Sequence, residues 1–134
     1  MEDFIIPKEI KIFTITAVSF PEDIGDVHHR LHKLLPPNPP RNSFGISRPE
    51  NGKIIYKAGA EFFENDNIDL KILEPFTIQS GTYISILIND FRNNLSQIDT
   101  AFKNLTSQKN IDPNGYCIEF YFNPKDVRCM IKTI

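Results

Sequence analysis

The sequence has no tryptophan, and only two cysteines and six glycines among its 134 residues. Two thiols in a chain of this length do not resemble the disulfide framework of a small secreted domain, so a reducing cytoplasm is the expected setting. Six glycines contain no glycine-rich loop that could cradle a phosphate. No apolar run approaches the roughly 20 residues of a membrane span, and the amino end shows no secretory signal. No membrane association is expected.

The chain also lacks a strong excess of charge. Fifteen basic and 17 acidic residues give a formal net charge of -2. A protein that holds nucleic acid through its phosphates needs a basic surface, so direct nucleic-acid binding is not expected. The length suits one domain, 1–134, that can bury its own hydrophobic core.

The first half of the chain predicts one strand, one helix and two further strands. A β-branched run predicts a strand over 10–18, and apolar residues at helical spacing between two prolines predict a helix over 22–35. Strands follow over 43–47 and 53–63, around the turn signal Asn51-Gly52.

The second half predicts the same order. Strands are expected over 70–78 and 82–88, and a helix capped by Asn89 or Asp90 follows them. Its apolar stripe consists of Phe91, Leu95, Ile98, Phe102 and Leu105. A hairpin of strands 116–122 and 127–133 ends the chain.

Corresponding elements lie roughly 72 residues apart, which predicts an internal duplication with pseudo-repeats of about 1–67 and 68–134. The predicted fold is α+β. Its duplicated βαββ units form two antiparallel sheets and two helices around a central cleft.

One acidic residue interrupts the apolar strand near the carboxyl end. Strand alternation places Glu119 on the same face as Cys117 and Tyr121, while the other face is apolar and predicts core. A carboxylate among such neighbours is costly to bury unless a partner or a cationic ligand compensates its charge. Glu119 is therefore the first candidate binding residue, and Tyr121 the second.

A structural ion pair is the alternative interpretation of Glu119. A two-residue turn in the final hairpin would set Glu119 opposite Met130, with Arg128 and Lys132 as diagonal neighbours that could neutralise it. The same register places Cys117 and Cys129 on opposite faces, so no disulfide is expected between them.

Aromatic residues on other strands are further candidates for the wall of a binding site. Tyr83 follows a glycine turn and could line the cleft or lie at the surface. Tyr56 and Phe62 alternate with Ala58 and Ala60, whose small side chains leave space for a ligand or for a packed helix.

His28 and His32 lie four residues apart on one helical face, which raises the question of a metal site. A zincin motif needs glutamate directly after the first histidine, and this chain has His29 there. No metal and no other cofactor is expected.

Three segments carry a resemblance to a known family: Gly81-Thr82-Tyr83, the helix from Phe91, and residues 112–123 with their glycine turn, glutamate and tyrosine. The chain resembles the GyrI-like, or bacterial effector-binding, domains of multidrug-responsive transcription regulators, and segments around Phe44 and Tyr56 extend the likeness. The resemblance implies two βαββ units around a cleft. Glu119 would lie at its base, facing a cationic aromatic ligand, with Phe44 among the binding residues.

Three functions remain open. The chain could be a stand-alone module that binds amphipathic cations and acts with a separate regulator. It could hydrolyse strained electrophilic rings, with Glu119 orienting water and Tyr121 supplying a proton. It could instead contact a protein, as a gyrase inhibitor would, through the acidic residues Glu61, Glu64, Asp66 and Asp69.

Overall fold

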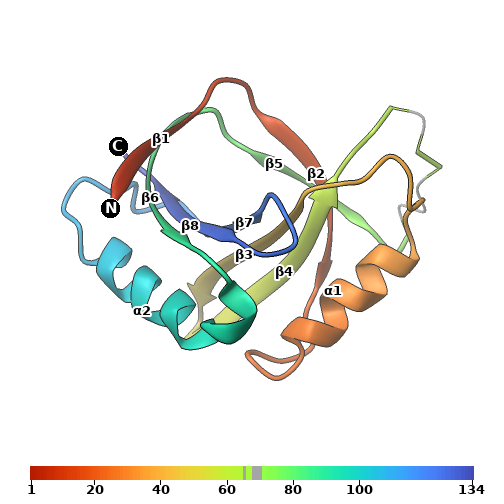
Figure 1. The fold of residues 1–134 in the computed structure, drawn as a ribbon, viewed down its shortest axis with the longest axis horizontal. Coiled ribbons are helices and arrows are strands. Elements are labelled where there is room, and N and C mark those ends of the chain that lie inside the picture. Colours follow the sequence, from red (N-terminus) through yellow and green to blue (C-terminus); the bar gives the residue numbers. More distant parts are fainter. Residues whose placement is uncertain (65, 68–70) are drawn as a thin grey trace.

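The computed structural model describes residues 1–64, 66–67 and 71–134. Its helical elements are α1 (Ile24–Lys33), the short 3-10 helix η1 (Phe91–Asn93) and α2 (Leu95–Thr106). Its strands are β1 (Glu2–Ile6), β2 (Ile10–Thr16), β3 (Ser43–Glu50), β4 (Lys53–Glu61), β5 (Glu74–Ile78), β6 (Gly81–Ile88), β7 (Cys117–Tyr121) and β8 (Val127–Lys132) (Figure 1).

The strands form one antiparallel sheet, in the order β1-β6-β8-β7-β3-β4-β2-β5, which curls into a half-barrel (Figure 1). The architecture is α+β, but the prediction of two separate sheets is wrong. The halves are joined because β3 pairs with β7, from Ser43 opposite Tyr121 to Ser47 opposite Cys117. This pairing satisfies backbone N–H and C=O groups that two separate sheets would leave at their edges.

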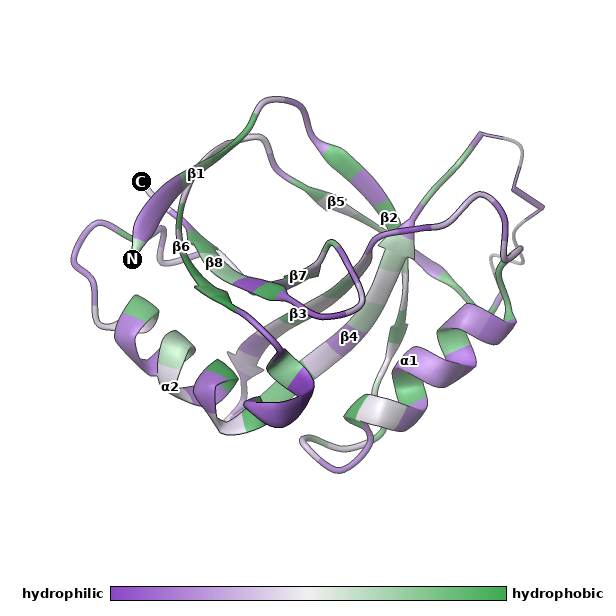
Figure 2. Cartoon of the chain, in the orientation of Figure 1, coloured by the Kyte–Doolittle hydropathy of each residue, from purple (hydrophilic) through white to green (hydrophobic). Residues whose placement is uncertain are grey.

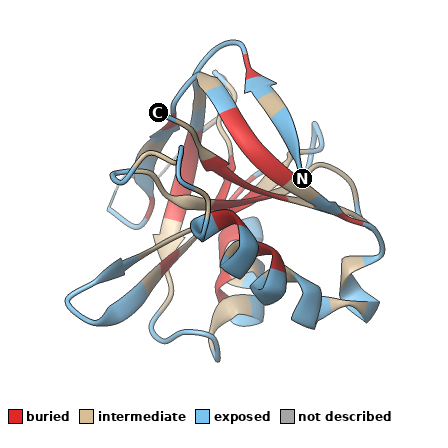
Figure 3. Cartoon of the chain, turned by 90° about the vertical axis from the view of Figure 1, so that its left-hand side faces the viewer, coloured by how far each residue is buried: buried red, intermediate tan, exposed pale blue. Residues whose placement is uncertain are grey.

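Both faces of the sheet are covered. The inner face of the curl carries a hydrophobic core of Ile6, Ile12, Phe44, Ile46, Ile78, Tyr83, Ile118 and Met130. On the outer face, α1 packs against β4 and β2, and α2 packs against β8 and β6. Both helices lie on this convex side and turn apolar residues toward the strands (Figure 1, Figure 2). Buried residues accordingly follow the strands and the sheet-facing sides of the helices (Figure 3).

Each half of the chain runs strand, strand, helix, strand, strand. The first strand of each half pairs with the other half: β1 with β6, and β5 with β2. The sequence pattern does not predict β1. It does predict a strand in the place of β5, but with a start at Leu70, which lies outside the described residues. Strand β5 begins at Glu74. A strand that depends on a distant partner has only a weak local signal.

Helix α1 is shorter than the predicted helix 22–35. Its start is delayed because the Asp23 carboxylate binds back to the preceding turn. It accepts hydrogen bonds from the amide of Val18 at 2.7 Å and from the guanidinium of Arg30 at 2.9 Å. The helix ends before Pro36, whose ring disfavours helical backbone in the residue that precedes it.

Candidate functional site

Glu119 lies at the centre of the sheet on strand β7. It pairs with Gly45 of β3 on one side and Cys129 of β8 on the other. Strand alternation turns its side chain, together with those of Cys117 and Tyr121, toward the helices. The glutamate is buried, with 8% of its surface exposed.

The helices pack mainly over the outer strands of each half, so β3 and β7 lie between them (Figure 1). We call the helix-facing residues of these two strands the interhelical floor: Ser43, Gly45, Ser47, Cys117, Glu119 and Tyr121. The residues from β3 are small, and Glu119 is the one acidic group of this floor.

Two tyrosine hydroxyls hold the Glu119 carboxylate. Oη of Tyr56 donates a hydrogen bond to Oε1 at 2.9 Å, and Oη of Tyr121 donates to the same oxygen at 2.6 Å. Gly45 makes room for this arrangement, because a Cβ at its position would lie 2.5 Å from Oε1. Within the described part of the chain, Oε2 accepts no hydrogen bond, and it is not fully shielded from solvent. The carboxylate thus has one open oxygen.

His28 on α1 extends this hydrogen-bonded chain. Its Nε2 lies 2.8 Å from Oη of Tyr56. Since Tyr56 donates its one hydroxyl proton to Glu119, His28 must donate from Nε2 to Tyr56. Burial lowers the pKa of His28 to about 4, and the charge of His32 adds to this effect. The ring is therefore neutral at pH 7, with its proton on Nε2.

Burial also shifts the acids of the site. It raises the pKa of Glu119 above its ordinary value, although the hydrogen bonds from Tyr121 and Tyr56 oppose this shift. Burial and the nearby carboxylate raise the pKa of both tyrosines, so they remain protonated donors. The same two causes raise the pKa of Cys117 to about 11 and that of Cys129 to about 12. Neither thiol is a reactive thiolate at neutral pH.

The hairpin of β7 and β8 differs in register from the predicted one. Glu119 lies opposite Cys129 rather than Met130. The turn is wider than two residues because the side-chain oxygen of Asn123 accepts hydrogen bonds from two later main-chain amides, both at 2.7 Å. A one-residue shift exchanges the two faces of a strand. It places Cys129 on the same face as Cys117, contrary to the prediction, and both are free thiols.

The shift also separates Glu119 from the basic residues of β8. The Arg128 guanidinium lies on the inner side, where it contacts a carboxylate oxygen of Glu2 at 2.7 Å and the hydroxyl of Ser85 at 2.9 Å. Lys132 also lies on that side and lines a cavity there. Among the residues that the structure describes, no lysine or arginine forms an ion pair with Glu119. The interpretation of Glu119 as half of an ion pair with these bases is therefore wrong.

Aromatic rings surround the carboxylate and its two donors. Phe20 stacks on Tyr56 with 5.8 Å between ring centroids, and Phe91 meets Tyr121 edge-on at 5.0 Å. His28 lies 5.9 Å from the ring of Tyr56 and 5.8 Å from that of Tyr121. Phe20 is 40% exposed and borders the solvent. The sequence pattern does not assign Phe20, Phe91 or His28 to the site, because they come from segments that meet only in the folded chain.

The structure places four of the predicted binding residues near one another on the helix side of the sheet: Glu119, Tyr121, Tyr56 and Cys117. Of the other three, Tyr83 and Phe44 lie on the inner face, and Phe62 lies on the helix side in the cluster beneath α1. Tyr83 faces the inner core, and its hydroxyl donates to a main-chain carbonyl at 2.7 Å. Phe44 shares that face and stacks on Phe120 at 5.1 Å, while Phe62 packs edge-on against Phe13 at 5.1 Å. These three residues contribute to packing away from the carboxylate.

Two cavities lie on the inner side of the sheet. A cavity of about 120 Å³ is bordered by Tyr83 and Ile118, and one of about 630 Å³ by Phe4, Phe120 and Met130. Neither borders Glu119. The predicted central cleft around Glu119 is thus neither of these cavities, and the carboxylate instead lies among the tyrosine rings on the helix side.

The residues described by the structure include no cluster of three or more histidine, cysteine, aspartate or glutamate side chains suited to a metal ion. His28 binds Tyr56, and Nε2 of His32 lies 2.8 Å from Oγ of Ser43. No helix within the described ranges is long and apolar enough to cross a membrane.

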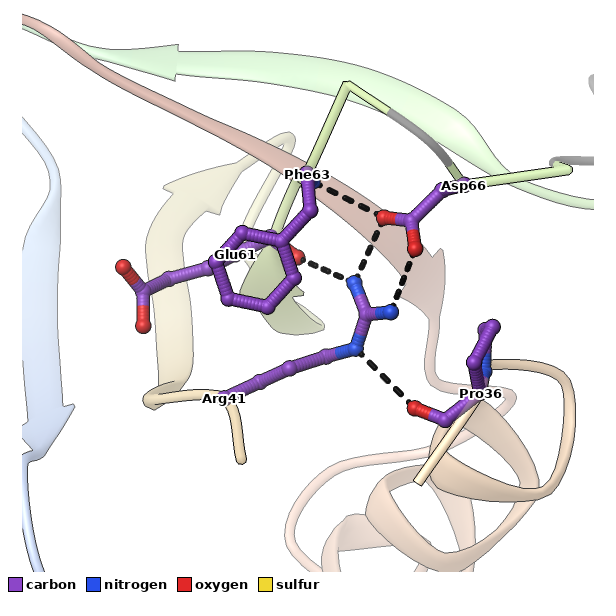
Figure 4. Close-up of polar contacts among 5 residues, drawn as sticks. All are labelled: Pro36, Arg41, Glu61, Phe63 and Asp66. Carbon is purple, nitrogen blue, oxygen red and sulfur yellow. Dashed lines mark hydrogen bonds and ion pairs between the residues drawn. The ribbon is translucent and has the colours of Figure 1, made fainter. Parts of the chain in front are cut away.

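The acidic segment 61–69, predicted as a possible protein-contact surface, forms several bonds within the protein itself. Asp66 forms a buried two-point ion pair with Arg41, whose Nη1 donates to one carboxylate oxygen at 2.6 Å (Figure 4). The same nitrogen donates to the main-chain carbonyl of Glu61 at 2.9 Å, and the Glu61 carboxylate accepts from a main-chain amide at 2.7 Å. Glu64 is exposed, and Asp69 lies outside the described residues. Two of the four acids therefore bind within the protein.

No family model matches the chain, and no curated protein matches it in sequence. Solved structures do share its fold. An integron cassette protein from the mobile metagenome of Vibrio cholerae is similar with a TM-score of 0.72 and 9% identity, over 99% of this chain and 95% of that chain. A structure described as a hydrolase from Listeria innocua has a TM-score of 0.58 and 9% identity, over 99% of this chain and 90% of that chain. At this identity the likeness shows the fold alone.

Proposed function

We propose that the protein binds amphipathic aromatic cations over the interhelical floor, with Glu119 as the charged contact. The observation that carries the proposal is a buried carboxylate that has an open oxygen and forms no ion pair with the described lysines and arginines. A buried carboxylate without a compensating cation is unfavourable. A positively charged ligand would supply the missing compensation, so its charge would contribute directly to affinity.

The surrounding rings support the aromatic part of the proposal. The rings of Tyr56 and Tyr121 flank the carboxylate, with Phe20 and Phe91 packed against them. A cation beside an aromatic face gains about 0.5–2 kcal/mol, depending on how far it is desolvated. The ligand would lie between α1 and α2, and its apolar body would contact these rings.

The proposal includes membership of the GyrI-like effector-binding domains. The same order of elements in both halves of the chain supports an internal duplication of βαββ units, with pseudo-repeats 1–67 and 68–134. In this proposal the chain is a cytoplasmic module that senses or sequesters its ligand. A role in multidrug response or transcription regulation would need a DNA-binding module in addition to the residues that the structure describes.

The test compares a cation with its neutral analogue. Naphthylmethylammonium and naphthylmethanol would be titrated into the wild-type protein, Glu119→Gln and the control Glu50→Gln, which removes an exposed carboxylate. We expect the Glu119→Gln substitution to weaken the binding of the ammonium by roughly tenfold or more, because a charge-assisted hydrogen bond is lost. Binding of the alcohol should not change. Equal affinities of all three proteins for the ammonium would refute the proposal.

A hydrolase is the second candidate, favoured by the short contact of 2.6 Å between Tyr121 and Glu119 and by the likeness to a structure described as a hydrolase. Ionised Glu119 would take a proton from water as the water oxygen attacks a carbon of a strained ring. The ring bond would break, and its electron pair would take a proton from Tyr121. Burial raises the pKa of Tyr121 and makes it a weak acid, which favours binding over turnover.

Turnover separates these two functions. A strained-ring alkylating compound would be incubated with the wild-type protein and Glu119→Gln, and its ring-opened product counted per protein molecule. Many product molecules per wild-type protein, and none beyond background from the variant, would establish the hydrolase. Product that never exceeds one molecule per protein would exclude it.

A further inference from the structure

The two oxygens of the Glu119 carboxylate have different environments. Oε1 accepts hydrogen bonds from both Tyr56 and Tyr121, whereas Oε2 accepts none from the described residues. An ionised carboxylate has about four acceptor positions, two on each oxygen. Oε1 is therefore saturated, and the available acceptor positions are on Oε2.

The protein holds both donors in place. The hydroxyl of Tyr56 is fixed by His28 at 2.8 Å, and its ring stacks on Phe20. The ring of Tyr121 is held between Phe91 and His28. Because the rings are packed on both sides, neither hydroxyl can leave Oε1 without moving several neighbours. A ligand consequently meets a carboxylate that can accept from one oxygen only.

We infer that this site selects cations that donate through a single N–H group, such as protonated amines, over amidinium and guanidinium groups. The inference rests on the proposed function. A planar amidinium or guanidinium binds a carboxylate best with two parallel hydrogen bonds, one to each oxygen. With Oε1 occupied, such a group makes one of its two bonds and leaves its second donor unpaired. A protonated amine has no fixed coplanar pair of donors to match to two oxygens, so it makes its best contact by donating one N–H to Oε2.

The same geometry also predicts the relative affinity of cations that have no N–H group. A quaternary ammonium keeps the Coulomb attraction to Glu119 and the contacts with the rings, but it cannot donate to Oε2. It should bind more weakly than the protonated amine and more tightly than a neutral analogue.

The test uses ligands that share one aromatic body. Calorimetric titration of the wild-type protein would compare naphthylmethylammonium, naphthamidinium and naphthylmethyltrimethylammonium. We expect the primary ammonium to bind about tenfold more tightly than the amidinium, with the quaternary ion weaker than the primary one.

A tyrosine variant supplies a second and independent readout. Tyr121→Phe removes one donor from Oε1 and opens an acceptor position there, so the ratio of amidinium affinity to ammonium affinity should rise several-fold. Tyr116→Phe is the matched control, because Tyr116 packs against Phe76 on the inner side of the sheet. Tyr56→Phe should shift the ratio in the same direction as Tyr121→Phe. Thermal melts would confirm that each variant is folded.

The outcomes separate this inference from the proposed function. Ammonium preference in the wild-type protein, together with a changed ratio in Tyr121→Phe but not in Tyr116→Phe, supports the inference. If the amidinium binds as tightly as the ammonium in the wild type, the inference is wrong and the proposed function stands. If no cation binds in a manner that depends on Glu119, the proposed function fails, and the inference fails with it.

Discussion

Arg128 and Glu119 lie on adjacent strands, but their side chains are on opposite faces of the sheet. Arg128 donates to Glu2 at 2.7 Å and lies over the ring of Phe4, 4.6 Å from its centroid. Glu119 instead accepts hydrogen bonds from two tyrosines on the helix side. This separation leaves a carboxylate without a basic partner on β8, and the first two predictions follow from it.

Replacing Glu119 should stabilise the protein in a pH-dependent way. Because its pKa in the folded state is raised, the native protein binds more protons than the unfolded chain as the pH rises above about 4.5, and its stability falls. Glu119→Gln should not lose stability in this way, because glutamine carries no titratable proton. Its amide oxygen can still accept hydrogen bonds from both tyrosines. We expect the variant to be more stable than the wild type at pH 7, and the difference to shrink toward pH 4. Urea unfolding at both pH values measures this, and a difference that does not vary with pH would contradict it.

Binding of a cation should release protons. Because its pKa is raised, Glu119 keeps its proton to a higher pH than an ordinary glutamate does, and a cation binds the ionised form, so affinity should increase as the pH rises through that pKa. Calorimetry in buffers of different ionisation heat should show release of up to about one proton. Glu119→Gln should release none. The other titratable groups around the carboxylate are His28, Tyr56, Tyr121, Cys117 and Cys129. Binding that exchanges no protons near the pKa of Glu119 would refute this prediction.

His28 should make stability fall in acid. Its folded pKa of about 4 lies below the ordinary value of 6.5, so the unfolded chain binds more protons between these pH values. Stability from this group is complete above pH 6.5 and is lost as the pH falls to 4, by about 3 kcal/mol. His28→Gln should lack this component, while the exposed control His29→Gln should keep it. An NMR titration that places the His28 ring near its ordinary pKa would contradict the burial argument.

Gly45 should tolerate no side chain. A Cβ there would lie 2.5 Å from Oε1 and 2.9 Å from Cδ of Glu119, so Gly45→Ala must push the carboxylate away from its donors. We expect a loss of about 2–4 kcal/mol in stability and weaker ammonium binding. Gly25→Ala is the control, because nothing lies within 4 Å of a Cβ at that position in α1, and it should stabilise the protein by about 0.5–1 kcal/mol. Similar melting temperatures for the two variants would contradict the predicted clash between a Cβ at position 45 and the Glu119 carboxylate.

The ion pair of Arg41 with Asp66 should be a strong contributor to stability. Both side chains are nearly fully buried, at 3% and 5% exposure, and Arg41 also donates to the carbonyls of Pro36 and Glu61 (Figure 4). Removing one partner leaves an unpaired buried charge, so Arg41→Ala should cost about 3–5 kcal/mol. The ion pair between Arg48 and Glu50, 3.7 Å apart, is more exposed and should contribute less than about 1 kcal/mol. Arg48→Ala therefore serves as the control. Equal losses in denaturant unfolding would contradict the difference in burial.

Side-chain alternation in β7 was predictable from the sequence because it depends only on neighbouring residues. The period of two places Cys117, Glu119 and Tyr121 on one face in any register. Most helices and strands were predictable for the same reason, with errors of a few residues at their ends. The start of α1 is one such case, since the Asp23 carboxylate accepts a hydrogen bond from Val18 in the preceding turn.

The pairing of β7 with β8 was not predictable in this way. Its register depends on how the side chain of Asn123 widens a turn, and the predicted two-residue turn gave a register that differs by one residue. The prediction that Tyr83 lines the site rested on treating one face of its strand as core, but both faces of this sheet are buried. A buried face therefore could not be recognised as inner or outer from the pattern alone.

One carboxylate among apolar neighbours on a strand is a feature of the amino-acid sequence, because local periodicity and residue type are properties of adjacent positions. The groups that contact this carboxylate depend on the folded chain. Tyr56 from β4, His28 from α1 and the bare backbone of Gly45 reach Glu119 because distant strands pair in one particular register. That register depends on long-range contacts, which no local pattern contains.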